Sequence, residues 1–175
     1  IEITEAGSPI IVWRKEFRTD SGGAGYHRGG LGQVMEVDTL DTAPFAVSAN
    51  YDRVLFPPRG RDGGHDGAAG VVRLKSGEHL RGKGQQTVPY GERLLIEMPG
   101  GGGIGDPLQR PAEMVAKDVR EGMVSAEKAR SVYGVALDDA HAVIADQTEI
   151  LRKQLRAKLK QDAAEDRSVQ METST

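Results

Sequence analysis

The chain has 175 residues, with 23 lysines and arginines against 26 aspartates and glutamates, and a formal net charge of −3. This acidic balance argues against nucleic-acid binding as the main function, and no apolar run approaches the ~20 residues that a membrane-spanning helix needs. The absence of cysteine excludes disulfides, thiolate catalysis and cysteine-ligated zinc, and it is compatible with the cytoplasmic location that we expect.

The first part of the chain is predicted to be β-structure. Of the 23 glycines, 21 lie in residues 1–105, and they separate short runs of β-branched and aromatic residues. These runs predict strands at 10–17, 33–40, 44–51, 70–75 and 92–98. Short strands at this spacing are typical of a mostly antiparallel sheet. We therefore expect an α+β protein in which residues 1–106 form a glycine-rich, mostly antiparallel β part.

A helical part is expected over residues 107–163. Pro111 suits the first turn of a helix, because its missing N–H would have no partner there, and Gly122 is the expected stop of this helix. Ser125 and Gly134 are the expected N-cap and stop of a second helix.

The rest of the helical part is predicted to hold a short hairpin and a longer helix. "VALDDAHAVI" has two apolar runs around a pair of aspartates, a pattern that favours a turn. Asp146 and Glu149 form a D-x-x-E pattern that predicts a capped helix over about 147–162. The polar residues 164–175 are expected to form a flexible tail.

The stretch "DSGGAGYHRGGLG" at 20–32 leaves three interpretations open. A phosphate-binding loop would need a helix after Gly32, where the sequence predicts a strand. A nucleophile at Ser21 would need a strand–turn–helix context, which is also missing. We favour a backbone role, in which glycines permit close approach and a charge-assisted hydrogen bond between Asp20 and Arg28 pins the loop.

Two further glycine-rich stretches are each open to more than one interpretation. His65 stands between Asp62 and Asp66, so this stretch could bind a divalent metal or form a solvated turn. "MPGGGGIGDP" could be a flexible lid, a loop that closely approaches a substrate, or a tight crossover to the helical part. For its run Gly100, Gly101, Gly102 and Gly103 we expect at least one positive φ and a close approach of backbone or ligand to another.

Four blocks of the sequence, in this order and spacing, resemble the C-terminal part of the hydantoinase B/oxoprolinase family. They are "DSGGAGYHRGGLG", "FPPRGRDGGHDGAAG", "PYGERLLIEMPGGGGIGDPLQR" and "VAKDVREGMVSAEKARSVYGVAL". The resemblance covers residues 8–160. It implies a part in the ATP-dependent hydrolysis of a cyclic amide, such as 5-oxoproline or a hydantoin. Biotin-independent carboxylases of acetone and acetophenone are similar to the same family, so a carboxylase component, or a structural module of either complex, is the alternative.

The resemblance also implies what lies outside this chain. Members are several times longer, and their His and Asp metal ligands lie in an N-terminal region that this sequence does not match. We therefore expect no metal ligand and no cofactor on this chain, ATP and Mg²⁺ on a hydantoinase A-type partner, and a divalent metal in the N-terminal region. The expected assembly is a hetero-oligomer of this chain, the remainder of the hydantoinase B-type chain and the ATP-binding partner.

The lack of an initial Met fits a chain that begins inside a longer polypeptide, with a dedicated small subunit as the alternative, and we expect the isolated chain to be inactive. The residues expected to border the active site are Asp20, Ser21, Tyr26, His27 and Arg28. No residue in the chain discriminates among the possible substrates, so the resemblance leaves hydrolase and carboxylase open.

Overall fold

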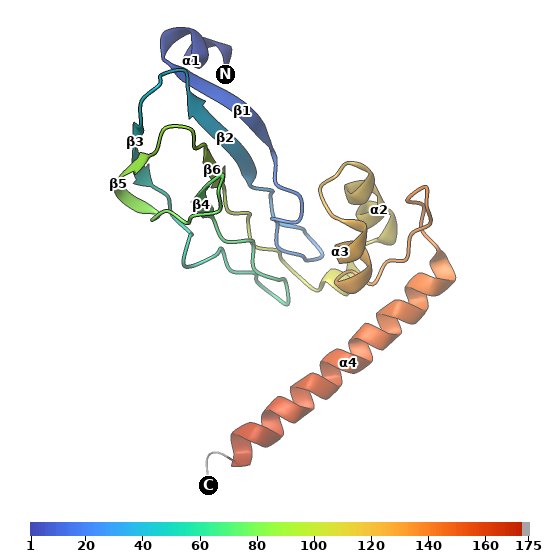
Figure 1. Cartoon of the computed structure of the whole chain (residues 1–175). Helices are drawn as coiled ribbons and strands as arrows, with labels where there is room; N and C mark the ends of the chain where they lie inside the picture. The colour runs from blue at the N-terminus through green and yellow to red at the C-terminus, as the bar shows by residue number, and fades with distance from the viewer. Residues whose placement is uncertain (173–175) are drawn as a thin grey trace. The chain divides into compact units, whose positions relative to one another are not determined.

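The computed structural model describes the backbone of residues 1–172 and the side chains of residues 1–162 and 164. The chain divides into two compact units, Ile1–Pro107 and Leu108–Thr175 (Figure 1). The division falls one residue from the boundary that the glycine distribution indicated. None of the helices described is long and apolar enough to span a membrane.

The first unit is built from antiparallel sheets, so the α+β class predicted from the sequence is confirmed. A four-stranded sheet has the order β1-β2-β6-β4, with every neighbouring pair antiparallel. Its strands are β1 (Ile10–Phe17), β2 (Gln33–Thr39), β6 (Leu94–Glu97) and β4 (Val71–Leu74). A separate two-stranded sheet pairs β3 (Phe45–Asn50) with β5 (Lys83–Val88).

The hydrophobic core of this unit gathers around β6. Leu94, Leu95 and Ile96 are all buried, because β6 lies between β2 and β4. Val72, Leu74 and Val88 join Leu94 and Ile96 in one cluster, so the core links both sheets. This core fixes the sheet from which the glycine-rich segments emerge.

Two elements of the first unit were not predicted. Strand β5 has the sequence KGQQTV, which lacks an apolar alternation, and its Gly84 has φ of 92°. Pairing with β3 stabilises this segment as a strand, and that contact between distant segments leaves no local signal. The short helix α1 (Glu2–Gly7) has no side-chain N-cap, so it too lacks a local start signal.

One face of the four-stranded sheet carries a charged cluster around Glu36. The Arg93 guanidinium donates to Glu36 at 2.7 Å, and Lys75 lies 3.6 Å from the same carboxylate. Arg93 also lies over the Trp13 ring, 4.2 Å from its centroid. The hydrogen bond from Arg93 holds the pKa of Glu36 below its ordinary value of 4.5, against the opposing effect of burial.

We expect this cluster to make stability depend on pH. A carboxyl group with a lowered pKa in the folded state stabilises the fold above pH 4.5, and this contribution is lost as the pH falls through the lowered pKa. Glu36→Gln should therefore destabilise the protein by about 1 kcal/mol at pH 7 and by progressively less toward pH 3. Urea unfolding from pH 3 to 7 measures the difference. Glu78→Gln, on an exposed side chain, is the control; an equal pH dependence in both variants would contradict the assignment.

The second unit contains α2 (Ala112–Arg120), α3 (Ala126–Ser131) and α4 (Ala145–Glu172). The predicted stops Gly122 and Gly134 have φ of 70° and 62°, the left-handed conformation in which glycine ends helices. The Ser125 hydroxyl accepts a hydrogen bond from the Lys128 amide at 3.1 Å, as expected of an N-cap. The stops of α2 and α3 and the N-cap of α3 were therefore predicted correctly, whereas Pro111, expected in the first turn of α2, is its N-cap.

The predicted hairpin consists of a single antiparallel bridge between Leu137 and Val143. The Asp138 carboxylate accepts from the amides of Ala140 and Ala142, at 2.9 and 2.8 Å, and so closes the turn. His141 has φ of 58° within it.

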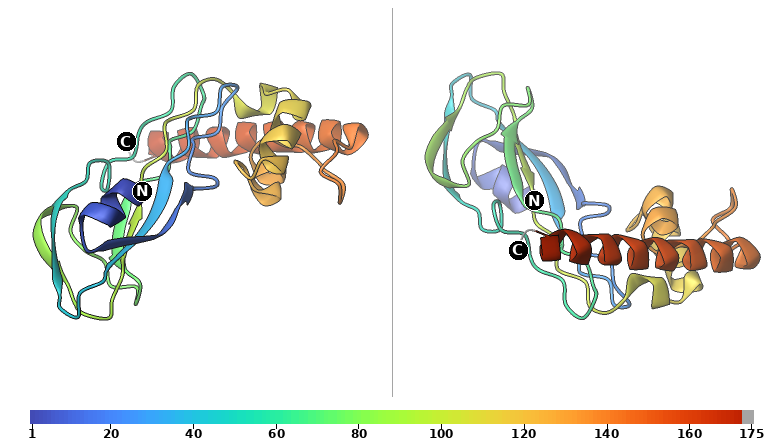
Figure 2. Two further views of the ribbon diagram at one scale, coloured as in Figure 1. Left: turned by 90° about the horizontal axis from the view of Figure 1, so that it is seen from above. Right: turned by 90° about the horizontal axis from the view of Figure 1, so that it is seen from below.

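Helix α4 differs from the prediction at both ends. It begins at Ala145, so Asp146 lies in its first turn rather than at the N-cap, and Glu149 forms an ion pair with Lys153 at 2.7 Å. It continues through Glu172, as one uninterrupted helix (Figure 2). Residues 164–172 of the expected tail are therefore helical, while its flexibility stays a prediction and 173–175 lie outside the described residues. The segment lacks proline and glycine, so nothing in it stops a helix once formed.

Candidate functional site

Three glycine-rich segments leave the four-stranded sheet at the same end. The first glycine segment, 20–32, connects β1 to β2; the second, 58–70, leads into β4; the third, 99–105, follows β6. The strand register pairs Phe17 with Gln33 and places Glu97 beside both Val34 and Val71, so the segments emerge next to one another. They run side by side beyond the sheet (Figures 1 and 2).

Backbone hydrogen bonds join the first and third segments. His27 and Ile104 exchange two bonds of 2.9 Å, N–H to carbonyl in both directions. The Gly23 amide donates to the Gly101 carbonyl, and the Gly101 amide donates to the Gly30 carbonyl, both at 2.8 Å. The third segment thus takes the place of a strand between its neighbours, although it has no regular strand structure.

The second segment is bonded to both of the others. The His65 amide donates to the Ala24 carbonyl at 2.7 Å, while the His65 carbonyl accepts from Gly103 at 2.9 Å. Arg61 donates to the Gly103 carbonyl at 2.9 Å and accepts from Gly105 at 3.0 Å. We call these three mutually bonded segments the glycine bundle. Its backbone groups pair with one another, which is what lets irregular chain be buried.

Glycine is required in the bundle because the backbones pack without room for side chains. A Cβ at Gly100 would lie 1.8 Å from the Ser21 carbonyl oxygen, and one at Gly103 would lie 2.1 Å from that of Ala24. At Gly102 the obstacle is the Arg59 carbonyl oxygen, at 2.1 Å. Gly101 is less crowded, with its nearest atom at 3.2 Å. The close approach expected for this run is thus present, and the approaching groups are backbone.

The expected positive φ is not present in this run. None of Gly100, Gly101, Gly102 and Gly103 has a positive φ; the nearest glycine that does is Gly105, at 77°. The prediction was wrong because these glycines do not turn the chain. They lie in lengths of chain packed against other chain, so the missing Cβ matters and the freedom in φ does not.

Ser21 supports the bundle rather than facing a substrate. It is buried, its hydroxyl donates to the Arg18 carbonyl at 2.5 Å, and the same oxygen accepts from the Gly32 amide at 2.8 Å. This hydroxyl therefore closes the base of the first segment. A nucleophile must be exposed toward its substrate, and Ser21 is not.

Removing the Ser21 hydroxyl should cost stability. Ser21→Ala leaves the buried Gly32 amide without its acceptor, and an unsatisfied buried donor costs roughly 1–3 kcal/mol. Chemical denaturation of Ser21→Ala and of the exposed Ser76→Ala provides the measurement and its control. If the two variants unfold at the same denaturant concentration, the hydroxyl contributes nothing to the bundle.

The other four residues expected near an active site lie in the same segment but differ in exposure. Tyr26 and His27 are exposed and stack edge to face, with ring centroids 4.8 Å apart. Arg28 is partly buried and donates to the Gly29 carbonyl at 2.8 Å. Asp20 is partly buried, with φ of 62°. The pairing of Asp20 with Arg28 stays a prediction, and of the five residues only Tyr26 and His27 present exposed side chains.

The second segment does not assemble the metal site that its sequence allowed. The Asp66 carboxylate accepts from the Gly60 amide at 2.7 Å and so closes a turn. Within the described residues, no three His, Cys, Asp or Glu side chains lie close enough together to hold a metal ion. The divalent metal that the family resemblance implies is expected in the N-terminal region outside this chain, and no chemical step is derived through it.

Arg18 is a structural residue of the bundle that the sequence did not reveal. Its guanidinium donates to the carbonyls of Ala69 and Met98, at 2.7 and 3.3 Å, and pairs with Glu97 at 3.0 Å. Its own amide donates to the Gly32 carbonyl at 2.9 Å. The side chain of Arg18 thus joins the end of the second segment to the residue before the third, and its backbone amide holds the end of the first. An arginine after a strand carries no motif, so no sequence signal identifies it.

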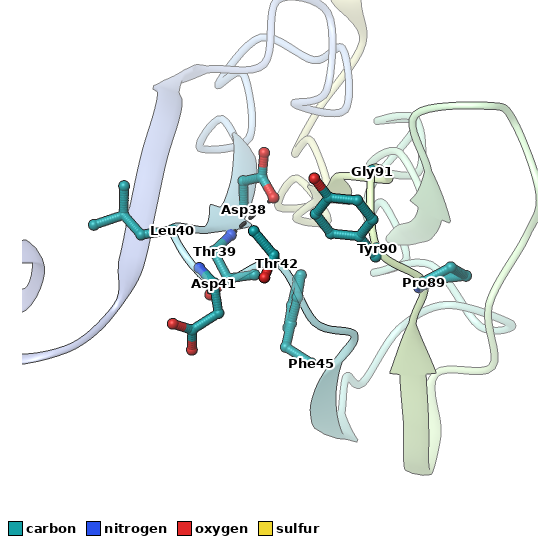
Figure 3. A pocket seen from close by; sticks show the side chains of 9 residues that line it. All are labelled: Asp38, Thr39, Leu40, Asp41, Thr42, Phe45, Pro89, Tyr90 and Gly91. Atoms are coloured by element: carbon teal, nitrogen blue, oxygen red, sulfur yellow. Dashed lines mark hydrogen bonds between the residues drawn. The ribbon is translucent and has the colours of Figure 1, made fainter.

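A hollow of about 310 Å³ lies at the other end of the sheet, around the end of β2. It is lined by Asp38, Thr39, Leu40, Asp41, Thr42, Phe45, Pro89, Tyr90 and Gly91 (Figure 3). Asp38 accepts from the Thr39 amide at 2.8 Å and pairs with Arg93 at 3.4 Å. Its carboxylate thus takes part in local structure, and we assign no chemistry to this hollow.

Fold and site together define an α+β scaffold organised around a bundle of glycine backbone. Residues 1–107 match the family model of hydantoinase B/oxoprolinase. The chain belongs to this family.

The relatives include enzymes that act on cyclic amides. Caprolactamase subunit beta of Pseudomonas jessenii is 39% identical over 79% of this chain and 25% of its own length. 5-Oxoprolinase 1 of Arabidopsis thaliana is 39% identical over 61% of this chain and 9% of its own length. The chain therefore spans a quarter or less of these relatives.

Solved structures agree with the family assignment. The crystal structure of the ATP-dependent caprolactamase from Pseudomonas jessenii matches 87% of this chain and 28% of its own, with a TM-score of 0.72 and 32% identity. A nucleotide-free structure of acetone carboxylase matches 90% of this chain and 26% of its own, with a TM-score of 0.69. At 23% identity, this second match shows a shared fold alone.

Proposed function

We propose that this chain works as the C-terminal part of a hydantoinase B-type subunit, in an ATP-dependent enzyme that hydrolyses a cyclic amide. The observation that carries the proposal is the 39% identity to caprolactamase subunit beta across 79% of this chain. The match to the caprolactamase crystal structure supports it, because that match extends over both units of the chain.

The chemistry explains why such an enzyme needs ATP. A lactam carbonyl is a poor electrophile because the nitrogen lone pair is delocalised into it. Transfer of the γ-phosphoryl group of ATP to the lactam oxygen gives ADP and an activated O-phosphorylated lactam. Water then adds to the carbon, and the ring C–N bond breaks to release the amine and leave an acyl phosphate. A second water hydrolyses the acyl phosphate to a carboxylate and inorganic phosphate, which completes the ring-opened amino acid. We propose that ATP is bound by a hydantoinase A-type partner in a hetero-oligomer.

In this proposal the chain contributes shape rather than a self-contained set of catalytic groups. The glycine bundle has paired backbone groups, and its segments pack too closely for a side chain at Gly100, Gly102 or Gly103, so it forms a firm wall. Tyr26 and His27 project from that wall and are the side chains we propose to border the active site. A rigid wall holds such groups in place at little entropic cost on substrate binding.

Two other functions compete with this one. A ketone carboxylase component is supported by the fold shared with acetone carboxylase, but at an identity too low to carry function. A purely structural module is the other. It predicts that removal of 107–175 abolishes complex formation in co-purification; a truncated complex that stays intact but inactive would contradict an assembly role for the helices.

Substrate-dependent ATP hydrolysis tests the proposed function. The complete hydantoinase B-type polypeptide that carries this chain is purified with its ATP-binding partner, and ADP release is measured with 5-oxoproline, a hydantoin and caprolactam, or with acetone plus bicarbonate. We expect at least one lactam to stimulate ADP release and to yield the ring-opened amino acid. Stimulation by acetone that requires bicarbonate, with none by any lactam, would reject hydrolysis in favour of carboxylation.

A further inference from the structure

A cavity of about 680 Å³ lies against the second glycine segment. It is lined by Arg53, Phe56, Pro57, Pro58, Arg59, Arg61 and Asp66. Its volume falls within the range that holds a small metabolite. Three guanidinium groups against one carboxylate give its wall a positive charge, although the whole chain has a net charge of −3. We propose that this cavity binds the phosphate group of a small organic phosphate.

The three arginines are available for a ligand. Within the part of the chain that the structure describes, the side chains of Arg53, Arg59 and Arg61 have no hydrogen-bond or ion-pair partner, and the one interaction seen is a weak attraction between Arg53 and Asp52. That Asp52 is held by Lys83 at 2.6 Å, and Asp66 accepts from the Gly60 amide. The nearby carboxylates are thus engaged elsewhere.

The glycine bundle positions two of these arginines. Arg61 donates to the Gly103 carbonyl and accepts from the Gly105 amide, and the Arg59 carbonyl lies against Gly102, where no Cβ would fit. Both side chains therefore begin from backbone that cannot shift freely. Both residues are exposed, so their guanidinium groups are accessible to a ligand, and the planar fork of a guanidinium loses less freedom per hydrogen bond formed than an ammonium does.

Arg53 completes the charged wall from another loop. Its carbonyl accepts from the Gly70 amide at 2.9 Å, and its φ of 61° is uncommon for a residue other than glycine. Such backbone strain is often found where a side chain is held for binding, and here it accompanies an arginine that lines the cavity.

The chemistry of the wall favours a phosphate over a carboxylate. A guanidinium offers a planar set of donors that matches two oxygens, and a phosphate dianion has enough oxygens and charge for three such groups. Phe56, Pro57 and Pro58 add an apolar side to the cavity, which suits an organic group attached to the phosphate. The proposal needs neither ATP hydrolysis nor a partner subunit, so it stands or fails apart from the proposed function.

Isothermal titration calorimetry of the 175-residue chain tests the site, with phenyl phosphate, inorganic phosphate and benzoate as probes. We expect phenyl phosphate to bind with a Kd of roughly 1 mM and benzoate, of similar shape but with one charge, at least about tenfold more weakly. Inorganic phosphate should bind more weakly than phenyl phosphate, since it lacks the apolar group. If phenyl phosphate and inorganic phosphate bind with equal affinity, the proposal of an organic phosphate is wrong and the site binds free phosphate instead.

Arginine variants test whether these side chains bind the phosphate group. Arg59→Gln and Arg61→Gln should each weaken phenyl phosphate binding at least about tenfold, whereas Arg130→Gln, on an exposed side chain of α3, should leave it unchanged. Arg53→Gln provides an independent variant outside the bundle. Thermal melting checks that each variant stays folded. No binding up to about 20 mM, benzoate binding equal to phenyl phosphate, or an equal loss in Arg130→Gln would overturn the proposal.

Discussion

Gly100→Ala is expected to prevent the glycine bundle from forming. The new methyl group would lie 1.8 Å from the Ser21 carbonyl oxygen, and both groups belong to backbone that is hydrogen-bonded within the bundle. Neither can move without breaking those bonds. Overpacking of side chains typically costs 1–3 kcal/mol, so a clash with backbone should cost about 3 kcal/mol or more. Urea unfolding, followed by the fluorescence of Trp13 in the same unit, measures the loss.

Gly30→Ala is the matched control for this variant. Gly30 lies in the first glycine segment, has no positive φ, and has no atom within 4 Å of the position that a Cβ would occupy. Alanine there should be neutral or stabilise the fold by ~0.4–1 kcal/mol, because it restricts the unfolded chain. If Gly100→Ala unfolds at the same urea concentration as Gly30→Ala, the close packing of the bundle is wrong.

Asp118→Ala is expected to destabilise the second unit strongly. Asp118 and Arg110 form an ion pair at 2.9 Å, and their side chains are only 9% and 7% exposed. Removing the carboxylate leaves the guanidinium charge buried without this counter-ion, which typically costs 3–5 kcal/mol. Helix α2 carries Asp118, so the loss should appear in thermal unfolding followed by circular dichroism at 222 nm.

Two further variants separate the buried charge from the loss of a contact. Arg110→Met combined with Asp118→Leu removes both charges, and it should recover most of the stability lost in Asp118→Ala. Glu149→Ala breaks the exposed pair with Lys153 at 2.7 Å, and it should cost less than about 1 kcal/mol. A double variant that is as unstable as the single one would show that side-chain packing, rather than charge, explains the effect.

Local patterns in the sequence predicted most of the fold. The β-branched and aromatic run at 10–17 coincides with β1, and the glycines at 122 and 134 stop two helices. In both cases the information lies within a few residues. Strand β5 depends on its pairing with β3, in which Val88 lies opposite Phe45, 43 residues earlier in the chain, and no local pattern contains that information.

The candidate site was predicted only in outline for the same reason. Four consecutive glycines indicated a close approach, but the carbonyls that approach belong to Ser21, Ala24 and Arg59, far away in sequence. Arg18 acts through carbonyls of the other two segments, which no motif records. The arginines of the cavity likewise come together only once the second segment is bonded into the bundle.

Exchange of this chain into caprolactamase subunit beta tests the central claim most directly. The quarter of that subunit that matches this chain is replaced by residues 1–160, and the purified chimeric complex is assayed for caprolactam-dependent ADP release. If the chain supplies the corresponding part of a cyclic amide hydrolase, the chimera should retain caprolactam-dependent turnover, and Gly100→Ala within it should abolish that turnover. A chimera that assembles, binds ATP and shows no lactam-dependent ADP release would contradict the account.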